Sequence, residues 1–144
     1  MKHTGYLSLL LVGCLSACAT GPQKVAQELQ GNWQPVEAVL AGQPVSHAVL
    51  QVIHLKLDHG QYAVLAAGQP DVGTYSVDAT AQPMGITIAG TAGPNQGKTL
   101  PAIFALKGDT LVICYDLSGA KRPTEFKSVA GTQLYLVTYN RKKE

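Results

Sequence analysis

The sequence predicts an all-β fold of about eight short antiparallel strands, preceded by one short helix. Hydrophobic and polar residues alternate with period two along many short runs, as they do in strands that bury one face. Clusters of Gly, Pro, Asn and Asp separate these runs, and 15 glycines and 8 prolines in 144 residues leave little room for long helices. Short strands at such regular spacing indicate a β-sandwich or an up-and-down barrel.

The alternating runs place the elements in chain order. We expect strands at residues 32–39, 50–58, 61–66, 73–78, 84–89, 99–106, 110–116 and 132–140. In the second run, Ile53 and Leu55 share a face, and polar residues occupy the other face. We expect residues 23–30 to form the short helix and residues 45–50 to form a helical turn or lid.

Residues 1–17 have the pattern of a secretion signal. Lys2 and His3 provide a basic start, and an apolar run of about ten residues follows and ends in small residues. A helix needs about twenty apolar residues to span a bilayer, so this run is too short to be a transmembrane segment.

The junction Leu-Ser-Ala-Cys at residues 15–18 resembles the lipobox of bacterial lipoproteins. The resemblance implies that the signal is cut before Cys18, that this cysteine is lipidated, and that the protein is anchored to a membrane. Several acyl chains on one residue anchor a protein stably, whereas a single chain binds only marginally. Ala19 rather than Asp follows the cysteine, which by resemblance to sorted lipoproteins implies the outer membrane, facing the periplasm. The alternative is an ordinary secretion signal with an incidental cysteine.

These observations divide the chain into a lipoprotein signal peptide (residues 1–17), a lipidated cysteine with a tether (18–27) and one folded domain (28–144). Cys114 is the single cysteine of that domain, which therefore contains no internal disulfide. Its apolar neighbours predict a buried, unreactive thiol.

Composition and motifs exclude several classes of function. Eleven basic and nine acidic side chains give a formal charge of +2, which is too balanced for a nucleic-acid-binding protein. His47, His54 and His59 lack the spacing of a metal site. The glycines of residues 93–99 have the wrong spacing for a phosphate loop, and no helix is expected after them. With no nucleophile and base in a recognisable pattern, we expect no catalytic residues, no metal and no cofactor.

Five segments of the folded domain resemble, in order, a family of small secreted bacterial domains, often called planctomycete-type, that have a lipocalin-like barrel. The segments are residues 29–33 (LQGNW), 73–78 (GTY followed by Asp78), 93–99 (GPNQGKT), 108–111 (GDTL) and 122–126 (RPTEF). Residues 102–104 depart from the pattern, because an aromatic-rich strand is expected there. The resemblance implies a lipocalin-like up-and-down barrel, and it implies no function because none is established for the family.

Gly31-Asn32-Trp33 also resembles the Gly-x-Trp signature of lipocalins. The resemblance implies that Trp33 closes the narrow end of the barrel and that a basic residue of the last strand, Arg141, stacks on it. A guanidinium over an indole ring contributes about 0.5–2 kcal/mol, depending on how far it is removed from water.

Residues 122–126 have two interpretations. In the first, Lys121 and Arg122 line the barrel mouth and meet an anion. In the second, which we favour, the segment fixes the bend into the last strand, with Phe126 buried and Arg122 paired with an acid such as Asp116.

Two functions of different kinds remain open. In the first, which we favour, a lipid-anchored barrel binds one small apolar or amphipathic ligand in the cell envelope, as barrels of about eight strands can do. The residues expected at its mouth are Tyr62, Tyr75, Tyr115, Arg122 and Phe126. In the second, the barrel is packed solid, and an apolar patch at residues 45–50 or 66–72 docks an envelope protein, as in an inhibitor or scaffold. Neither is an enzyme.

Overall fold

The computed structural model describes residues 21–144, in which strands dominate and two short helices accompany them. The elements in chain order are α1 (Gly21–Leu29), β1 (Gly31–Leu40), β2 (Gln43–Pro44), α2 (His47–Gln51), β3 (His54–Asp58), β4 (Gln61–Leu65), β5 (Asp71–Asp78), β6 (Met84–Ala92), β7 (Thr99–Lys107), β8 (Thr110–Asp116) and β9 (Leu134–Arg141). Lipidation of Cys18 and the signal at residues 1–17 lie outside the described residues.

Each strand from β3 to β9 pairs antiparallel with the next, and β1 closes the sheet by pairing with both β3 and β9. Trp33 marks this closure, because it lies opposite Leu55 on one side and Arg141 on the other. The short β2 extends the sheet beyond the barrel by pairing with the end of β1. The all-β prediction is therefore confirmed, as a closed barrel of eight antiparallel strands with one extra strand.

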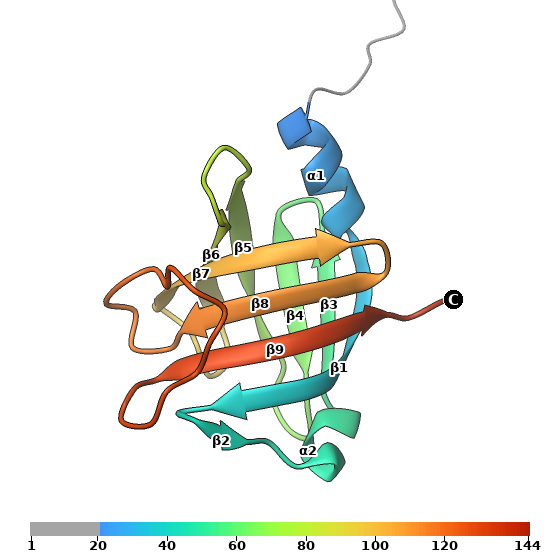
Figure 1. Ribbon diagram of the computed structural model, residues 1–144. Coiled ribbons are helices and arrows are strands. Elements are labelled where there is room, and N and C mark those ends of the chain that lie inside the picture. The colour runs from blue at the N-terminus through green and yellow to red at the C-terminus, as the bar shows by residue number, and fades with distance from the viewer. Residues whose placement is uncertain (1–20) are drawn as a thin grey trace, which may run out of the picture.

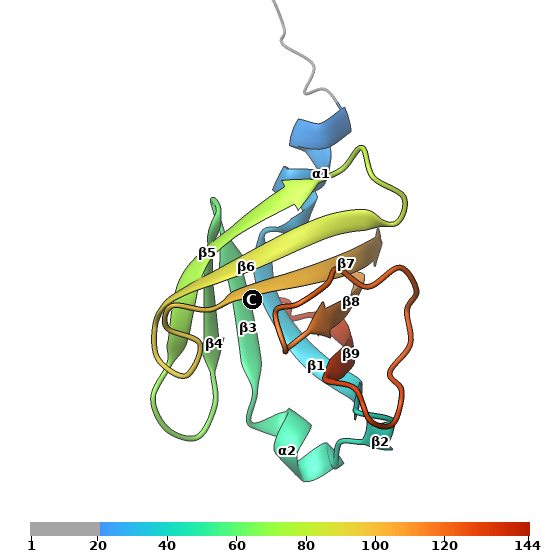
Figure 2. The ribbon, with the colours of Figure 1, turned by 90° about the vertical axis from the view of Figure 1, so that its left-hand side faces the viewer.

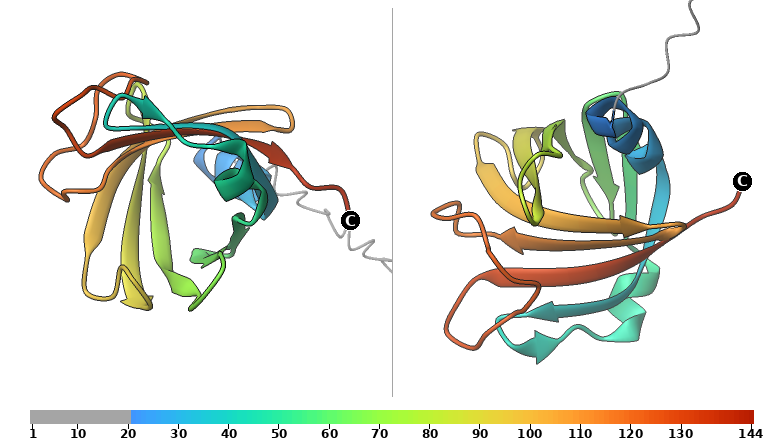
Figure 3. Two further views of the ribbon diagram at one scale, coloured as in Figure 1. Left: turned by 90° about the horizontal axis from the view of Figure 1, so that it is seen from below. Right: turned by 45° about the horizontal axis from the view of Figure 1, so that its top comes forward.

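The up-and-down order gives the barrel two different ends (Figures 1 and 2). Helix α1 lies at one end, at the top of both views. The strand order places the connections at residues 59–60, 79–83 and 108–109 at the same end of the barrel. We call this the closed end. The longer loops at 66–70, 93–98 and 117–133 lie at the other end with α2, which we call the open end. Figure 3 shows from two further directions how the strands curve around the space between these ends.

Large apolar side chains fill the closed-end half of the barrel. Residues with at most 1% exposure include Leu29, Trp33, Leu57, Ile86, Phe104, Leu111, Ile113 and Val137. They come from α1 and from strands on both sides of the barrel, and they alternate with more exposed residues along most strands, as period-two patterning requires. The core of the molecule is thus one continuous interior, with Val25 of α1 packed against it.

Several element boundaries differ from the expectation, among them the following three. The expected strand at 50–58 begins only at His54, because Leu50 belongs to α2 and packs inward with 2% exposure. The last strand begins at Leu134 instead of residue 132. The first helix begins at Gly21 and occupies most of the segment expected as a tether, since Leu29 at its end is fully buried. Neither described helix is long and apolar enough to cross a membrane.

Candidate functional site

The closed end is sealed by Trp33 and Arg141, which the structure brings together. Trp33 is fully buried, and its indole Nε1 donates a hydrogen bond of 2.9 Å to the carbonyl of Leu29. The guanidinium carbon of Arg141 lies 4.3 Å from the centroid of the Trp33 ring, within the range of a cation–π contact. The indole is therefore used for packing and is not available as a ligand platform.

Arg141 also fixes the end of α1. Its two terminal nitrogens donate to the carbonyls of Glu28 and Gln30 at 2.7 and 2.6 Å, and its Nε donates to Asp109 at 3.0 Å. Carbonyls at a helix C-terminus lack partners within the helix, so a cation there satisfies them and complements the helix dipole. Gly31 has a positive φ of 141°, and a Cβ there would lie only 2.8 Å from Arg141 Nη1. The glycine of the Gly-x-Trp segment thus leaves room for the guanidinium.

The open-end half of the barrel contains a cavity of about 440 Å³. Its lining combines apolar walls with a few polar groups. The lining residues are Ile53, Leu55, Tyr62, Val64, Asp71, Ile88, Asn95, Lys98, Leu100, Tyr115, Leu117, Gln133, Tyr135 and Tyr139. A volume in the range of about 300–1,000 Å³ with this mixture of surfaces is typical of small-molecule sites.

Tyrosines from opposite sides of the barrel line this cavity. Tyr115 and Tyr139 share a hydrogen bond of 3.1 Å between their hydroxyls, and the Tyr115 and Tyr135 rings stack with centroids 5.9 Å apart. Burial raises the pKa of both Tyr115 and Tyr139. Tyr62 approaches from β4, and burial together with the nearby Asp71 carboxylate raises its pKa to about 12. All these hydroxyls are therefore neutral near neutral pH and can donate or accept hydrogen bonds.

Asp71 is the buried charged side chain of the cavity, with 8% exposure. One carboxylate oxygen accepts from the Asn95 amide at 3.0 Å, and the other accepts from Asn95 Nδ2 at 2.7 Å and from the Tyr62 hydroxyl at 3.2 Å. Asn95 belongs to the β6–β7 loop, so this carboxylate also ties that loop to the start of β5.

The space for the Tyr62 ring depends on its cross-strand neighbour. Gly73 lies opposite Tyr62 in the β4–β5 ladder, and a Cβ at Gly73 would come within 2.8 Å of the ring and 2.0 Å of the carbonyl oxygen of Ala89. The glycine of the Gly-Thr-Tyr segment therefore permits both the strand pairing and the position of Tyr62.

Of the five residues expected at the mouth, Tyr62 and Tyr115 line the cavity, whereas Tyr75, Arg122 and Phe126 do not. Tyr75 points inward with 9% exposure but belongs to the closed-end half, where its amide donates to the carbonyl of Gly60 at 2.8 Å. Strand β5 begins at Asp71, two residues earlier than expected, so Asp71 takes the position near the open end and Tyr75 lies deeper in the barrel.

Arg122 lies on the outer surface of the barrel. Its Nη1 donates to the carbonyls of Ile86 and Ala102 at 2.9 and 2.6 Å, and its Nη2 donates to the Thr87 hydroxyl at 2.7 Å. Its guanidinium lies over Gly85, where a Cβ would approach Nη1 to 3.2 Å. Arg122 therefore ties the loop 117–133 to the outer side of β6 and β7.

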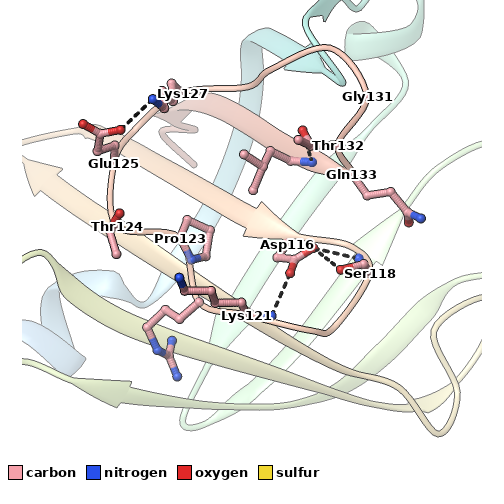
Figure 4. A pocket seen from close by; sticks show the side chains of 12 residues that line it. Asp116, Ser118, Lys121, Pro123, Thr124, Glu125, Lys127, Gly131, Thr132 and Gln133 are labelled. Atoms are coloured by element: carbon pink, nitrogen blue, oxygen red, sulfur yellow. Dashed lines mark hydrogen bonds and ion pairs between the residues drawn. The ribbon is translucent and has the colours of Figure 1, made fainter.

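The expected partner of Arg122 was wrong. Asp116 accepts hydrogen bonds from the amide and hydroxyl of Ser118 and from the amide of Lys121, and it makes no ion pair with Arg122 (Figure 4). These bonds close a tight loop at the end of β8 and hold the pKa of Asp116 below its usual range, despite the opposing effect of burial. The Asp116 carboxylate thus serves its own loop, and Arg122 reaches the strand carbonyls instead.

The loop 117–133 covers a second, smaller buried patch outside the barrel. Ile103 and Cys114 are opposite each other on β7 and β8, point away from the cavity, and have at most 1% exposure. The Cys114 thiol donates to the carbonyl of Lys127 at 3.4 Å, and burial raises its pKa. Phe126 is half-buried in this loop, so it contributes to covering the outer surface instead of forming a mouth.

A cleft of about 440 Å³ lies along the same loop (Figure 4). Most of its charged side chains already have partners: Lys127 pairs with Glu125 at 2.7 Å, Asp116 accepts from backbone amides, and Arg122 donates to strand carbonyls. Because these groups are already paired and the cleft lies outside the barrel, the cavity at the open end is the better candidate for a binding site.

The three histidines of the folded domain lie apart from this cavity. Among residues 21–144, no three His, Cys, Asp or Glu side chains gather closely enough to hold a metal ion. His59 contacts Asp58 at an exposed turn, and His54 Nδ1 is buried on the outer side of β3 with no hydrogen-bond partner in the described part of the chain.

Sequence reasoning missed most of the polar lining of the cavity. Tyr135 and Tyr139 could have been found, because both share the face of Val137 in the alternating pattern of the last strand. Asp71 and Asn95 carried no such signal, since both stand in Gly/Pro-rich segments that read only as turns.

The fold and the cavity define a class: a closed up-and-down antiparallel barrel with one sealed end and one cavity-bearing end. Comparison of the chain with protein-family models, curated proteins and solved structures gave no match. The family resemblance drawn from the sequence motifs therefore stays a prediction.

Proposed function

We propose that the protein is a lipid-anchored envelope protein whose barrel holds one small amphipathic ligand at its open end. The observation that carries the proposal is the cavity of about 440 Å³ within a barrel that is otherwise closely packed. A barrel of this size can fill its interior entirely with side chains, so a retained cavity calls for an occupant. The proposed function is binding, with no catalytic step, metal or cofactor.

The lining of the cavity supports an amphipathic ligand. Leu55, Ile88 and Leu100 provide apolar walls, while tyrosine hydroxyls and Asp71 supply polar groups that can fix an orientation. A wholly apolar ligand would leave these polar groups without added partners, and a wholly polar ligand would not cover the apolar walls.

The anchoring part of the proposal is supported by the lipobox-like junction before Cys18. Its test is the mass of the mature chain purified from a bacterial envelope. We expect a mature chain that starts at Cys18 and carries the added mass of acyl groups. In Cys18→Ala, both the cleavage before this residue and the added mass are expected to be lost. A mature chain that starts elsewhere and carries no lipid contradicts the anchor while leaving ligand binding open.

One observation favours the second function, docking of an envelope protein. The exposed large apolar side chains at the open end, with exposures between 39 and 50%, are Leu40, Val49, Val52, Leu65 and Val129. Exposed apolar residues that collect at one end of a molecule are typical of interaction sites.

Native mass spectrometry of the full chain, purified from its host envelope in detergent, separates the two functions. Ligand binding predicts an added small mass that is lost on denaturation. A clean mass with a co-eluting protein contradicts ligand binding and supports docking.

A pair of variants makes this experiment sharper. Leu117→Trp places a large ring at the edge of the cavity and is expected to abolish the added mass. Val36→Trp introduces the same ring at an exposed position of β1 that does not line the cavity, and it is expected to retain the added mass. Equal retention by both variants would place the bound molecule outside the barrel.

A further inference from the structure

The strongest unexplained feature of the cavity is the charge of Asp71. Its carboxylate is buried, yet all of its hydrogen-bond donors are neutral, namely Asn95 and the Tyr62 hydroxyl. In the described part of the chain, no Lys, Arg or His nitrogen lies within 4.0 Å of it. Buried carboxylates are usually paired with a cation, because removal from water is costly for an uncompensated charge.

The hydrogen bonds leave this carboxylate incompletely used. An ionised carboxylate has about four acceptor positions, and the two oxygens of Asp71 receive three hydrogen bonds. Because Asp71 lines the cavity, a group in the cavity can supply the missing donor together with the missing positive charge.

The aromatic lining suits a cation as well. Tyr62, Tyr115, Tyr135 and Tyr139 all line the same cavity, and the faces of tyrosine rings attract ammonium groups within about 6 Å. The tyrosine hydroxyls are neutral and can accept further hydrogen bonds from an ammonium group.

Lys98 supplies the competing possibility. It also lines the cavity, but it is exposed and lies at the open end in the β6–β7 loop. An anionic head could bind Lys98 there, but its body would then lie toward the uncompensated Asp71 carboxylate. Leaving a solvated lysine unpaired costs less free energy than leaving a buried carboxylate unpaired. A ligand that carries a charge opposite to that of Asp71 is therefore favoured over one that pairs with Lys98.

We infer that the cavity takes a cationic amphipathic amine, whose ammonium group pairs with Asp71 among the tyrosines and whose apolar body covers the aliphatic walls. This inference rests on the proposed function, because it names the chemical class of the ligand for the same cavity.

The test uses three probes that share a phenylalkyl chain and differ in their polar group: phenylbutylamine, phenylbutanol and phenylbutyrate. Their affinities are measured by titration calorimetry on the full chain in lipid nanodiscs, with empty nanodiscs as the blank. The amine is expected to bind at least about tenfold more tightly than the carboxylate, with the alcohol between them.

Two variants test whether Asp71 causes the preference for the amine. Asp71→Asn keeps the size of the side chain and removes its charge, so amine affinity is expected to fall about tenfold, to that of the alcohol. Asp58→Asn is the matched control, because it removes the same charge at an exposed position outside the cavity, and it is expected to leave amine affinity unchanged. Circular dichroism establishes that each variant is folded, and the ranking of the probes on the unaltered protein tests the inference even if Asp71→Asn does not fold.

The outcomes separate the inference from the function on which it rests. If the carboxylate binds most tightly, or if amine and alcohol bind equally, the inference is wrong and ligand binding stands. If none of the three probes binds, the proposed function loses its support together with the inference.

Discussion

The two ends of the barrel both use aromatic side chains, but with opposite results. At the closed end, Trp33 is fully buried and Arg141 covers its ring, so that both side chains are used in packing. At the open end, Tyr62, Tyr115 and Tyr139 surround a cavity and bring their hydroxyls into it. The comparison teaches that a small barrel can pack one half closely with an aromatic ring and keep a cavity among the aromatic rings of the other half.

Substitution of the central ring at each end gives the largest contrast. Trp33→Ala removes a fully buried indole and is expected to lower the free energy of unfolding by about 3–5 kcal/mol. Tyr135→Ala at the open end removes a ring that is only half-buried, and less than half of that loss is expected. Urea unfolding measures both variants, and equal losses would show that the two ends do not differ in packing.

Removal of Arg141 is expected to have the next largest effect. Arg141→Ala loses the cation–π contact and the hydrogen bonds to the end of α1, and should cost about 2–3 kcal/mol in urea unfolding. Arg141→Lys keeps the charge but lacks the planar fork, so it should recover less than half of the loss. Full recovery by lysine would mean that charge alone seals this end.

A smaller loss of stability is expected when Arg122 is replaced. This residue holds the loop 117–133, which starts at the open end, against the outer surface of the barrel. Arg122→Ala should cost about 1 kcal/mol in global stability but open the loop locally, exposing Cys114. The rate at which a thiol reagent labels the native protein should rise several-fold. Glu125→Gln breaks only an exposed ion pair of the same loop and serves as the control. Equal labelling rates for both variants would place the covering of Cys114 elsewhere.

At neutral pH, Tyr62→Phe is expected to change stability least, because it removes one hydroxyl and leaves the ring. The stability of this variant is expected to differ from that of the unaltered protein in its dependence on pH in the alkaline range. The folded-state pKa of Tyr62 is about 12 against 10 for an ordinary tyrosine, so its contribution is complete below pH 10 and is lost as the pH rises toward 12. Absorbance titration of tyrosinate and unfolding at several alkaline pH values test this, and a Tyr62 that ionises near pH 10 would contradict it.

The sequence predicts the fold well because alternation of apolar and polar residues is a local signal. In β3, for example, the buried Leu55 and Leu57 alternate with polar residues, and the expected run ends at Asp58, as observed. The pairing of Trp33 with Arg141 has no local signal, since the two residues are far apart in the chain, and it came from a resemblance. The structure then shows the physical reason, which is that β1 and β9 close the barrel in that register.

The candidate site was predicted less well, for a different reason. Which end of an inward-facing strand meets the cavity depends on strand length and register, and a shift of two residues moved Tyr75 out of the site and Asp71 into it. The position of Arg122 outside the barrel depends on the path of the loop 117–133. Loop paths follow from long-range contacts such as those to Ile86 and Ala102, which no periodicity reveals.

The place where α1 joins the barrel has a consequence for how an anchored molecule would stand. Cys18 and Gly21 are three residues apart, so a lipid on Cys18 stays within about 11 Å of the first turn of α1, whatever path the chain takes. That turn lies at the closed end (Figures 1 and 2), whereas the residues that line the cavity belong to the open-end half of the barrel. A chain tethered in this way would present its opening to the aqueous compartment and its sealed floor to the bilayer. Cargo would then arrive from solution or from an opposing surface, and not by sliding sideways out of the membrane beneath.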